Sequence, residues 1–266
     1  MSKNRFEFGR NWAAYVSTLN DERIAGAEDA LVSKLETSLV GRTFLDIGSG
    51  SGLMSLVARR QGAVVHSFDY DSQSVACTSE LKSRFYEGDL SWHVERGDVL
   101  DRAYIQNLGR FDVVYSWGVL HHTGDMWQAL SNVDDLVADG GTLFIAIYND
   151  QGWESRFWLA IKKLYNRMPP VMQRLMAGLI VVRFWARTVL IDASRGSPLK
   201  SWRSYVHDRG MSPWHDAIDW VGGYPFEVAK PEEVFDFYRR RGYILKRLKT
   251  CAGGTGCNEF IFHKSG

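Results

Sequence analysis

The sequence has few cysteines, almost no net charge and no obvious secretory segment, and each of these shortages excludes a class of protein. Its 266 residues include 3 cysteines and carry a formal net charge of +1. Cys77, Cys251 and Cys257 are too few and too widely spaced for a disulfide framework or a C-x-x-C pair. The polar N-terminus lacks the apolar core of a secretory signal. We therefore expect a cytoplasmic protein with reduced thiols.

The balanced charge provides no overall electrostatic attraction to nucleic acid, so we expect no nucleic-acid partner. Hydrophobic residues make up 45% of the chain and charged residues 24%, which is typical of a globular protein. A chain of this length can bury one full core and still carry an inserted lobe.

Short apolar runs alternate with amphipathic segments over the first 150 residues. The strands predicted from these runs lie at 43–47, 64–68, 91–96, 111–116 and 142–148. The predicted helices lie at 21–39, 53–60, 72–85 and 126–138. Such alternation predicts an α/β fold, with a mainly parallel sheet covered by helices on both faces.

The alternation stops after Asp150 and resumes near residue 231. Helical periodicity over 152–187 is broken at Pro169-Pro170. Residues 194–224 are expected to be irregular, because Gly, Pro, Trp, His and Asp are dense there. A helix at 231–241 then leads to strands at 243–248 and 259–263. The predicted segments are an N-terminal lid or helical segment at 1–39, a core at 40–150, an inserted substrate-binding lobe at 151–228 and a sheet-completing segment at 229–266.

The segment Asp46-Ile47-Gly48-Ser49-Gly50-Ser51-Gly52 joins the first predicted strand to its helix. Its glycines permit a tight turn and a close approach to a ligand, and the helix start offers free N–H groups to an anionic group. A nicotinamide dinucleotide site would have the spacing G-x-G-x-x-G, whereas this loop has G-x-G-x-G after an aspartate. A plain structural turn and a dinucleotide site remain the alternatives for this segment.

Three aspartates follow the first three predicted strands, where open α/β sheets bind ligands. Asp69 lies about 20 residues beyond the glycine loop, where an acid can hold ribose hydroxyls. Tyr70 is placed to pack on an adenine, and Asp98 to accept from its amino group. A single acid at a strand end is usually only solvated. Asp46, Asp69 and Asp98 together favour a nucleoside site.

These motifs resemble the class I S-adenosylmethionine (SAM)-dependent methyltransferases, most closely the small-molecule branch that includes ubiquinone-type O-methyltransferases. The matching motifs are Leu45–Gly52, Phe68–Asp71, Gly97–Val99, Phe111–Val114 with Val119–His122, and Gly140–Leu143. The resemblance covers residues 40–150 well and 231–263 in outline. It implies a Rossmann-like seven-stranded sheet whose last strand is antiparallel, with SAM as methyl donor and S-adenosylhomocysteine (SAH) as product. The implied cofactor-binding residues are Asp46, Gly48, Ser49, Gly50, Gly52, Asp69, Tyr70, Asp98, Val99 and Trp117.

Two histidines follow the fourth predicted strand, where the family places its acceptor. His121 is the first candidate for a general base that takes the proton of a hydroxyl acceptor, and His215 is the second. A metal site formed by His121, His122 and Asp125 is disfavoured because no further ligand spacing supports it. Residues 116–119 also lack the Asn/Asp-Pro-Pro-aromatic motif of many enzymes that methylate base or amide nitrogens. We therefore expect a small-molecule or glycan acceptor, methylated on oxygen.

Aromatic residues outside the predicted core are candidates for binding this acceptor. The predicted substrate-binding residues are Trp12, Tyr15, His122, Tyr148, Trp214, Trp220 and Tyr224. Plain core packing is the alternative for the two N-terminal aromatics, and a packed loop is the alternative for residues 214–225. An N- or S-methyltransferase of a small metabolite, a non-catalytic SAM-binding protein and a nicotinamide oxidoreductase remain the alternative functions.

Residues 171–191 are apolar but include Arg174, Arg183 and Arg187, so they lack the uncharged run of a transmembrane helix. Three interpretations stay open for this segment. It lies on a membrane surface near a lipid-linked acceptor, it is buried within the lobe, or it forms the contact of a homodimer.

Overall fold

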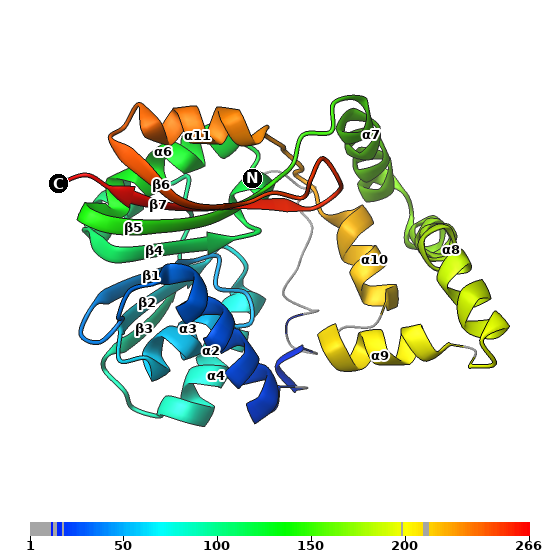
Figure 1. The fold of residues 1–266 in the computed structure, drawn as a ribbon, viewed down its shortest axis with the longest axis horizontal. Coiled ribbons are helices and arrows are strands. Elements are labelled where there is room, and N and C mark those ends of the chain that lie inside the picture. Colours follow the sequence, from blue (N-terminus) through cyan, green and yellow to red (C-terminus); the bar gives the residue numbers. More distant parts are fainter. Residues whose placement is uncertain (1–11, 13–14, 18, 198, 210–212) are drawn as a thin grey trace.

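The computed structural model describes the chain except residues 1–11, 13–14, 18, 198 and 210–212 (Figure 1). The side chains at 205–209, 213, 215–216 and 219 are not described either. The described residues form a seven-stranded sheet in the order β3-β2-β1-β4-β5-β7-β6. The strands are β1 (Thr43–Ile47), β2 (Val64–Asp69), β3 (Trp92–Arg96), β4 (Phe111–Trp117), β5 (Val137–Tyr148), β6 (Tyr243–Lys249) and β7 (Cys257–Lys264). Only β7 runs antiparallel to its neighbours β5 and β6, which confirms the predicted fold class.

Helices cover both faces of the sheet (Figure 1). One face carries α2 (Asp21–Leu35), α3 (Leu53–Arg60) and α4 (Ser72–Tyr86), and the other carries α5 (Arg102–Leu108), α6 (Met126–Leu136) and α11 (Pro231–Arg239). Successive residues of a strand point to opposite faces. Phe44 therefore belongs to the first core and Leu45 to the second, and both are fully buried.

One helix was missed, and the predicted helices at 21–39, 126–138 and 231–241 end earlier than predicted. No helix was predicted at α5, although Asp101 caps it by accepting from the backbone N–H groups of Ala103 and Tyr104. The helix predicted to reach residue 138 ends at Leu136, because the chain enters β5 at Val137. Gly140, with φ of 73°, lies in this early part of β5, and the pairing of β4 with β5 shifts register nearby.

Between β5 and α11 the chain forms a helical lobe of α7 (Trp153–Arg167), α8 (Pro170–Ser194), α9 (Lys200–Arg209) and α10 (Pro213–Gly222). The break at Pro169-Pro170 is confirmed, but the prediction that 194–224 is irregular was wrong. Ala217 and Val221 of α10 lie four residues apart and are buried, so a helical period was present among the polar residues. No described helix is both long and apolar enough to span a membrane.

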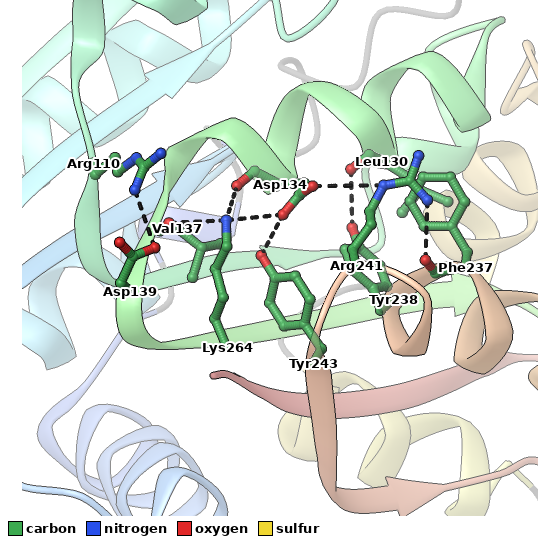
Figure 2. Close-up of polar contacts among 10 residues, drawn as sticks. All are labelled: Arg110, Leu130, Asp134, Val137, Asp139, Phe237, Tyr238, Arg241, Tyr243 and Lys264. Carbon is green, nitrogen blue, oxygen red and sulfur yellow. Dashed lines mark hydrogen bonds and ion pairs between the residues drawn. The ribbon is translucent and has the colours of Figure 1, made fainter. Parts of the chain in front are cut away.

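The C-terminal strands are held against α6 by Asp134 (Figure 2). Its carboxylate accepts from the Tyr243 hydroxyl at 2.9 Å and from Lys264 Nζ at 3.0 Å, and it lies 3.5 Å from Arg241 Nε. Lys264 Nζ also donates to the carbonyl oxygen of Asp134 at 2.9 Å. The Asp134 and Lys264 side chains are only 20% and 15% exposed, so solvent screens this pair less than a surface pair.

We expect Asp134→Ala to lower the free energy of unfolding by about 2 kcal/mol, because it removes the carboxylate that pairs with the largely buried Lys264 ammonium and leaves the Tyr243 hydroxyl without its acceptor. Urea denaturation measures the change. The matched control is Asp139→Ala, whose carboxylate is 66% exposed and pairs with Arg110. This control should cost less than about 0.5 kcal/mol. Equal losses in the two variants would contradict the role given to Asp134.

Candidate active site

A cavity of about 370 Å³ lies beside the glycine-rich loop that follows β1. The predicted site residues that line it are Trp12, Tyr15, Asp46, Gly48, Ser49, Gly50 and Trp117. The fold thus brings the two N-terminal aromatics to the loop, although more than 30 positions separate Trp12 from Gly48 in the sequence. The cavity lies at the carboxyl ends of the parallel strands, where α/β folds bind ligands.

The loop depends on its glycines. Gly48, Gly50 and Gly52 have φ values of 74°, 54° and 79°, which side chains rarely adopt. A Cβ on Gly48 would lie 2.4 Å from Val119 Cγ1, and one on Gly50 would lie 3.0 Å from the Trp12 ring. The loop is therefore in close contact with both the segment after β4 and the N-terminal aromatics.

Asp69, at the end of β2, holds the same loop. Its carboxylate accepts from the backbone N–H of Gly50 at 3.0 Å and from that of Asp71 at 2.9 Å. Asp69 thus fixes the loop from the end of β2, where an acid can also accept from ribose hydroxyls.

Asp46 lies beneath the loop and is 2% exposed. It accepts from Ser55 Oγ at 2.5 Å, and Ser55 Oγ lies 2.7 Å from Ser67 Oγ, which in turn accepts from Trp92 Nε1 at 2.9 Å. Burial raises the pKa of the Asp46 carboxyl to about 7, and the nearby charge of Asp69 adds to the rise while the Ser55 hydrogen bond opposes it. This buried chain orients a carboxylate that titrates near neutrality.

The remaining predicted cofactor residues lie at the same sheet edge, but the described cavity does not include them. Asp98 accepts from the Leu100 N–H at 2.9 Å, and Val99 is buried. Tyr70 is half-buried beside Arg96, whose guanidinium carbon lies 5.6 Å from the centre of its ring. A backbone bond from Gly97 to Asp69 keeps this edge next to the loop.

Several cavity residues were not predicted. Lys34 of α2 forms an ion pair with Glu259 of β7 at 2.8 Å, and Trp117 Nε1 donates to Glu259 at 3.4 Å. Lys34 and Glu259 are 225 residues apart in the sequence, so no local sequence pattern predicts their contact. Tyr115 could have been predicted as a cavity residue, because it lies two residues before Trp117 and therefore on the same face of β4.

A second cluster forms where the sheet meets the lobe. His121 and His122, in the short helix η1 (Leu120–His122), lie beside Tyr148 at the end of β5. The Tyr148 ring centre is 3.8 Å from that of His121 and 5.7 Å from that of Trp220 in α10. Lys162 of α7 is fully buried, with Nζ 4.5 Å from the centre of the Trp220 ring. We call these five residues the histidine–aromatic cluster.

The hydrogen bonds define the tautomers of the two histidines. The backbone N–H of Tyr148 donates to His121 Nδ1 at 3.3 Å, so in neutral His121 the proton is on Nε2. His122 Nδ1 lies 2.6 Å from the carbonyl oxygen of Pro225, which can only accept, so His122 carries its proton on Nδ1. Complete burial holds the pKa of His121 well below its usual range, and the charges of His122 and Lys162 lower it further.

Two buried nitrogens of this cluster, His121 Nε2 and Trp220 Nε1, have no hydrogen-bond partner among the described residues. The other two predicted lobe aromatics have different surroundings. Trp214 packs with the small lobe core that includes Ala177, and Tyr224 is half-buried just before Pro225. The side chain of His215 lies outside the described residues.

Comparisons with known proteins agree with this arrangement. A family model described as a methyltransferase domain matches residues 19–216, more than half of the chain. An uncharacterized methyltransferase of Mycobacterium tuberculosis is 30% identical over 130 residues, which cover 49% of this chain and 62% of that protein. A ubiquinone biosynthesis O-methyltransferase of Coxiella burnetii is 25% identical over 114 residues, which cover 43% and 47%. The chain thus spans less than two thirds of these curated relatives.

The fold likeness extends further. The structure of magnesium protoporphyrin IX methyltransferase from Synechocystis, solved with SAH bound, has a TM-score of 0.53 and 14% identity, covering 92% of this chain and 83% of that one. At this identity the likeness concerns the fold alone. The chain belongs to the methyltransferase-domain family, and within it to the class I SAM-dependent methyltransferases, whose methyl donor is SAM.

The groups around the loop suit SAM. The start of α3 offers backbone N–H groups to a carboxylate, and buried Asp46 can attract an ammonium group. Trp12, Tyr15 and Trp117 line the same cavity, and aromatic faces attract cations such as a sulfonium.

We expect the Asp46→Asn variant to gain stability relative to the parent protein as pH rises. Because the folded-state pKa of Asp46 is raised from 3.8 to about 7, the folded protein retains a proton that the unfolded chain releases between these values. Parent stability therefore falls through this window, whereas the variant has no such titration. Without ligand, the unfolding free energy of Asp46→Asn minus that of the parent protein should increase by about 2–3 kcal/mol from pH 5 to pH 8.

The matched control for this experiment is Asp89→Asn. The hydrogen bond from Arg59 lowers the pKa of Asp89 below 3.8, so this carboxyl does not titrate between pH 5 and pH 8. The unfolding free energy of Asp89→Asn relative to the parent protein should therefore stay constant over this range. Parallel curves for Asp46→Asn and the parent protein would show that Asp46 is not buried as described.

Proposed function

We propose that the protein transfers the methyl group of SAM to a hydroxyl oxygen of a small-molecule or glycan acceptor, held in the histidine–aromatic cluster. The observation that carries this proposal is the pair of buried nitrogens, His121 Nε2 and Trp220 Nε1, that have no partner among the described residues. Leaving a buried donor unpaired costs about 1–3 kcal/mol each, which an acceptor with suitably placed oxygens would recover. The rings of Tyr148 and Trp220 suit a ring-bearing acceptor.

The tautomers assign different roles to the two histidines. His122 has its lone pair on Nε2, so it is the better general base for the hydroxyl proton. His121 presents an Nε2–H group and resists a second proton, so it serves as a donor that orients the acceptor oxygen. The base role that the sequence favoured for His121 therefore moves to its neighbour in this proposal.

The cluster is connected to the cofactor loop through Val119. Its side chain packs against Gly48, and His121 and His122 follow within three residues. Transfer needs the acceptor oxygen aligned with the methyl group at short range, and this packing relates the two sites rigidly.

In the proposed reaction, the chain positions its ligands and moves one proton. When bound, SAM would supply an electrophilic methyl group on a positively charged sulfur, and the thioether of SAH would leave as the methyl group passes to the acceptor oxygen. Asp46 and the start of α3 would hold the amino-acid end of SAM, while Asp69 and Asp98 would hold its nucleoside. His122 takes the hydroxyl proton, and Trp12 with Tyr15 excludes water from the cavity.

We expect His122→Ala to reduce kcat about 100-fold with little change in SAM affinity, because general-base catalysis contributes about 10²–10⁴-fold. His121→Ala should chiefly raise the acceptor KM, by about tenfold, through loss of one hydrogen bond. SAH formation with hydroxyl-bearing acceptors gives the rates, and calorimetry gives the SAM affinity. His263→Ala, in β7 and away from the cluster, is the matched control.

Three results would contradict parts of this proposal. Equal kcat losses in both variants would remove the distinction between base and donor. Loss of SAM binding would place the histidines in the cofactor site. SAM binding by the parent protein without SAH formation from any acceptor pool would favour a non-catalytic SAM-binding protein.

A further inference from the structure

Helix α8 leaves most of its length uncovered (Figure 1). Of its 25 residues, only Ala177 and Asp192 are buried. Its most exposed large apolar residues, between 63% and 72% accessible, are Val171, Leu175, Leu179, Val182 and Leu190. Steps of four, four, three and eight residues place them on one side of a helix, where they form an apolar stripe about 28 Å long. This exposure removes the interpretation that the stripe is buried in the lobe.

The charges around the stripe have one sign. Arg183 and Arg187 are exposed. They lie four and eight residues after Leu179, so helical spacing places both along one long side of the stripe. The only acid of α8 is Asp192, which is 7% exposed and accepts from the backbone N–H of Ser201 at 2.7 Å and its hydroxyl at 2.8 Å. The solvent side of α8 is thus apolar and cationic.

This charge pattern disfavours a second copy as the occupant. In a two-fold dimer the same surface meets itself. Because Arg183 lies near the middle of the stripe, antiparallel pairing would bring the two copies of this arginine together, with no exposed acid on α8 to offset them. An anionic surface would pair with these arginines and would not incur this repulsion between like charges.

We propose that α8 lies flat on an anionic lipid bilayer, with the apolar stripe at the level of the acyl chains and the arginines at the headgroups. The inner side of α8 packs, through Ala177, against Val221 of α10, the helix that also carries Trp220. The lobe therefore has the stripe on its outer side and contributes to the histidine–aromatic cluster on its inner side. An acceptor with a lipid anchor would fit this arrangement, and that inference rests on the proposed function. The docking of α8 on a bilayer does not depend on the proposed function.

We expect the intact protein to sediment with vesicles of phosphatidylcholine containing about 30 mol% phosphatidylglycerol, and far less with phosphatidylcholine alone. Leu179→Glu should weaken this binding at least about tenfold, and Arg183→Gln and Arg187→Gln should weaken it about fivefold each. The matched controls are Leu90→Glu, at a leucine 98% exposed outside the lobe, and Arg60→Gln on α3. Neither should change binding.

Equal binding to the two vesicle types, or equal loss in the control variants, would overturn the docking proposal. A dimer in solution that Leu179→Glu converts to monomer would assign the stripe to a second copy instead. Neither SAM nor an acceptor is present in these measurements, so their outcome is independent of the proposed reaction.

A separate observation concerns the β2–β3 edge of the sheet. His66 of β2 and His93 of β3 are register partners, and Glu95 lies two residues further along β3 on the same face. One ligand atom from each lies within 4.8 Å of the others, the only such trio among the described residues. Glu95 is oriented by the Tyr104 hydroxyl, which donates to it at 2.7 Å.

We infer that these three side chains bind a divalent transition-metal ion, with Zn²⁺ as the best match. Two imidazoles and a carboxylate are a common zinc ligand set that leaves a position for water, and a hydrogen bond from outside the set orients the carboxylate. His93 is 59% exposed, so an ion can enter from solvent. The site would link the edge strand β3 to β2.

Calorimetry of EDTA-treated protein with zinc chloride should show one saturable site. We expect His93→Ala and Glu95→Gln to weaken it at least about tenfold, whereas the control His263→Ala leaves it unchanged. Zinc should also raise the Tm of the parent protein but not that of His93→Ala. Absence of saturable binding, or equal affinity in His93→Ala, would overturn the site.

Discussion

The architecture of the active site depends on a loop whose backbone has no room for side chains. Gly48, Gly50 and Gly52 adopt left-handed φ values while Val119 and Trp12 pack directly on the first two. This contact serves two purposes at once. It opens the start of α3 toward the cofactor, and it sets the position of the segment after β4 that carries the histidines.

The site therefore divides into two parts with different physics. The cofactor cavity combines backbone N–H groups, buried Asp46 and aromatic walls, all of which suit a charged ligand. The histidine–aromatic cluster is largely buried, and two of its nitrogens, His121 Nε2 and Trp220 Nε1, lack partners among the described residues. Electrostatic attraction is suited to holding the donor, whereas unpaired polar groups among rings are suited to selecting an acceptor.

The lobe adds a third environment. Its small core of Tyr165, Ala177 and Val221 holds the helices together, and most of α8 faces outward. The lobe thus leaves apolar area of α8 exposed, and this exposure is the basis of the proposed docking surface. Its inner helix, α10, contributes Trp220 to the cluster and packs against α8, so two neighbouring helices connect the proposed docking surface with the proposed acceptor site.

Local spacing in the sequence determined much of this protein. The bounds of β1 and α3 agree with prediction, because period-two and period-3.6 patterns record which side chains meet the core. The strand-end aspartates and the G-x-G-x-G loop likewise indicated the cofactor, since parallel strands bring their ends together. Tertiary structure alone decided the ion pair of Lys34 with Glu259 and the proton positions on His121 and His122. These depend on partners distant in the chain, and a local pattern carries no record of them.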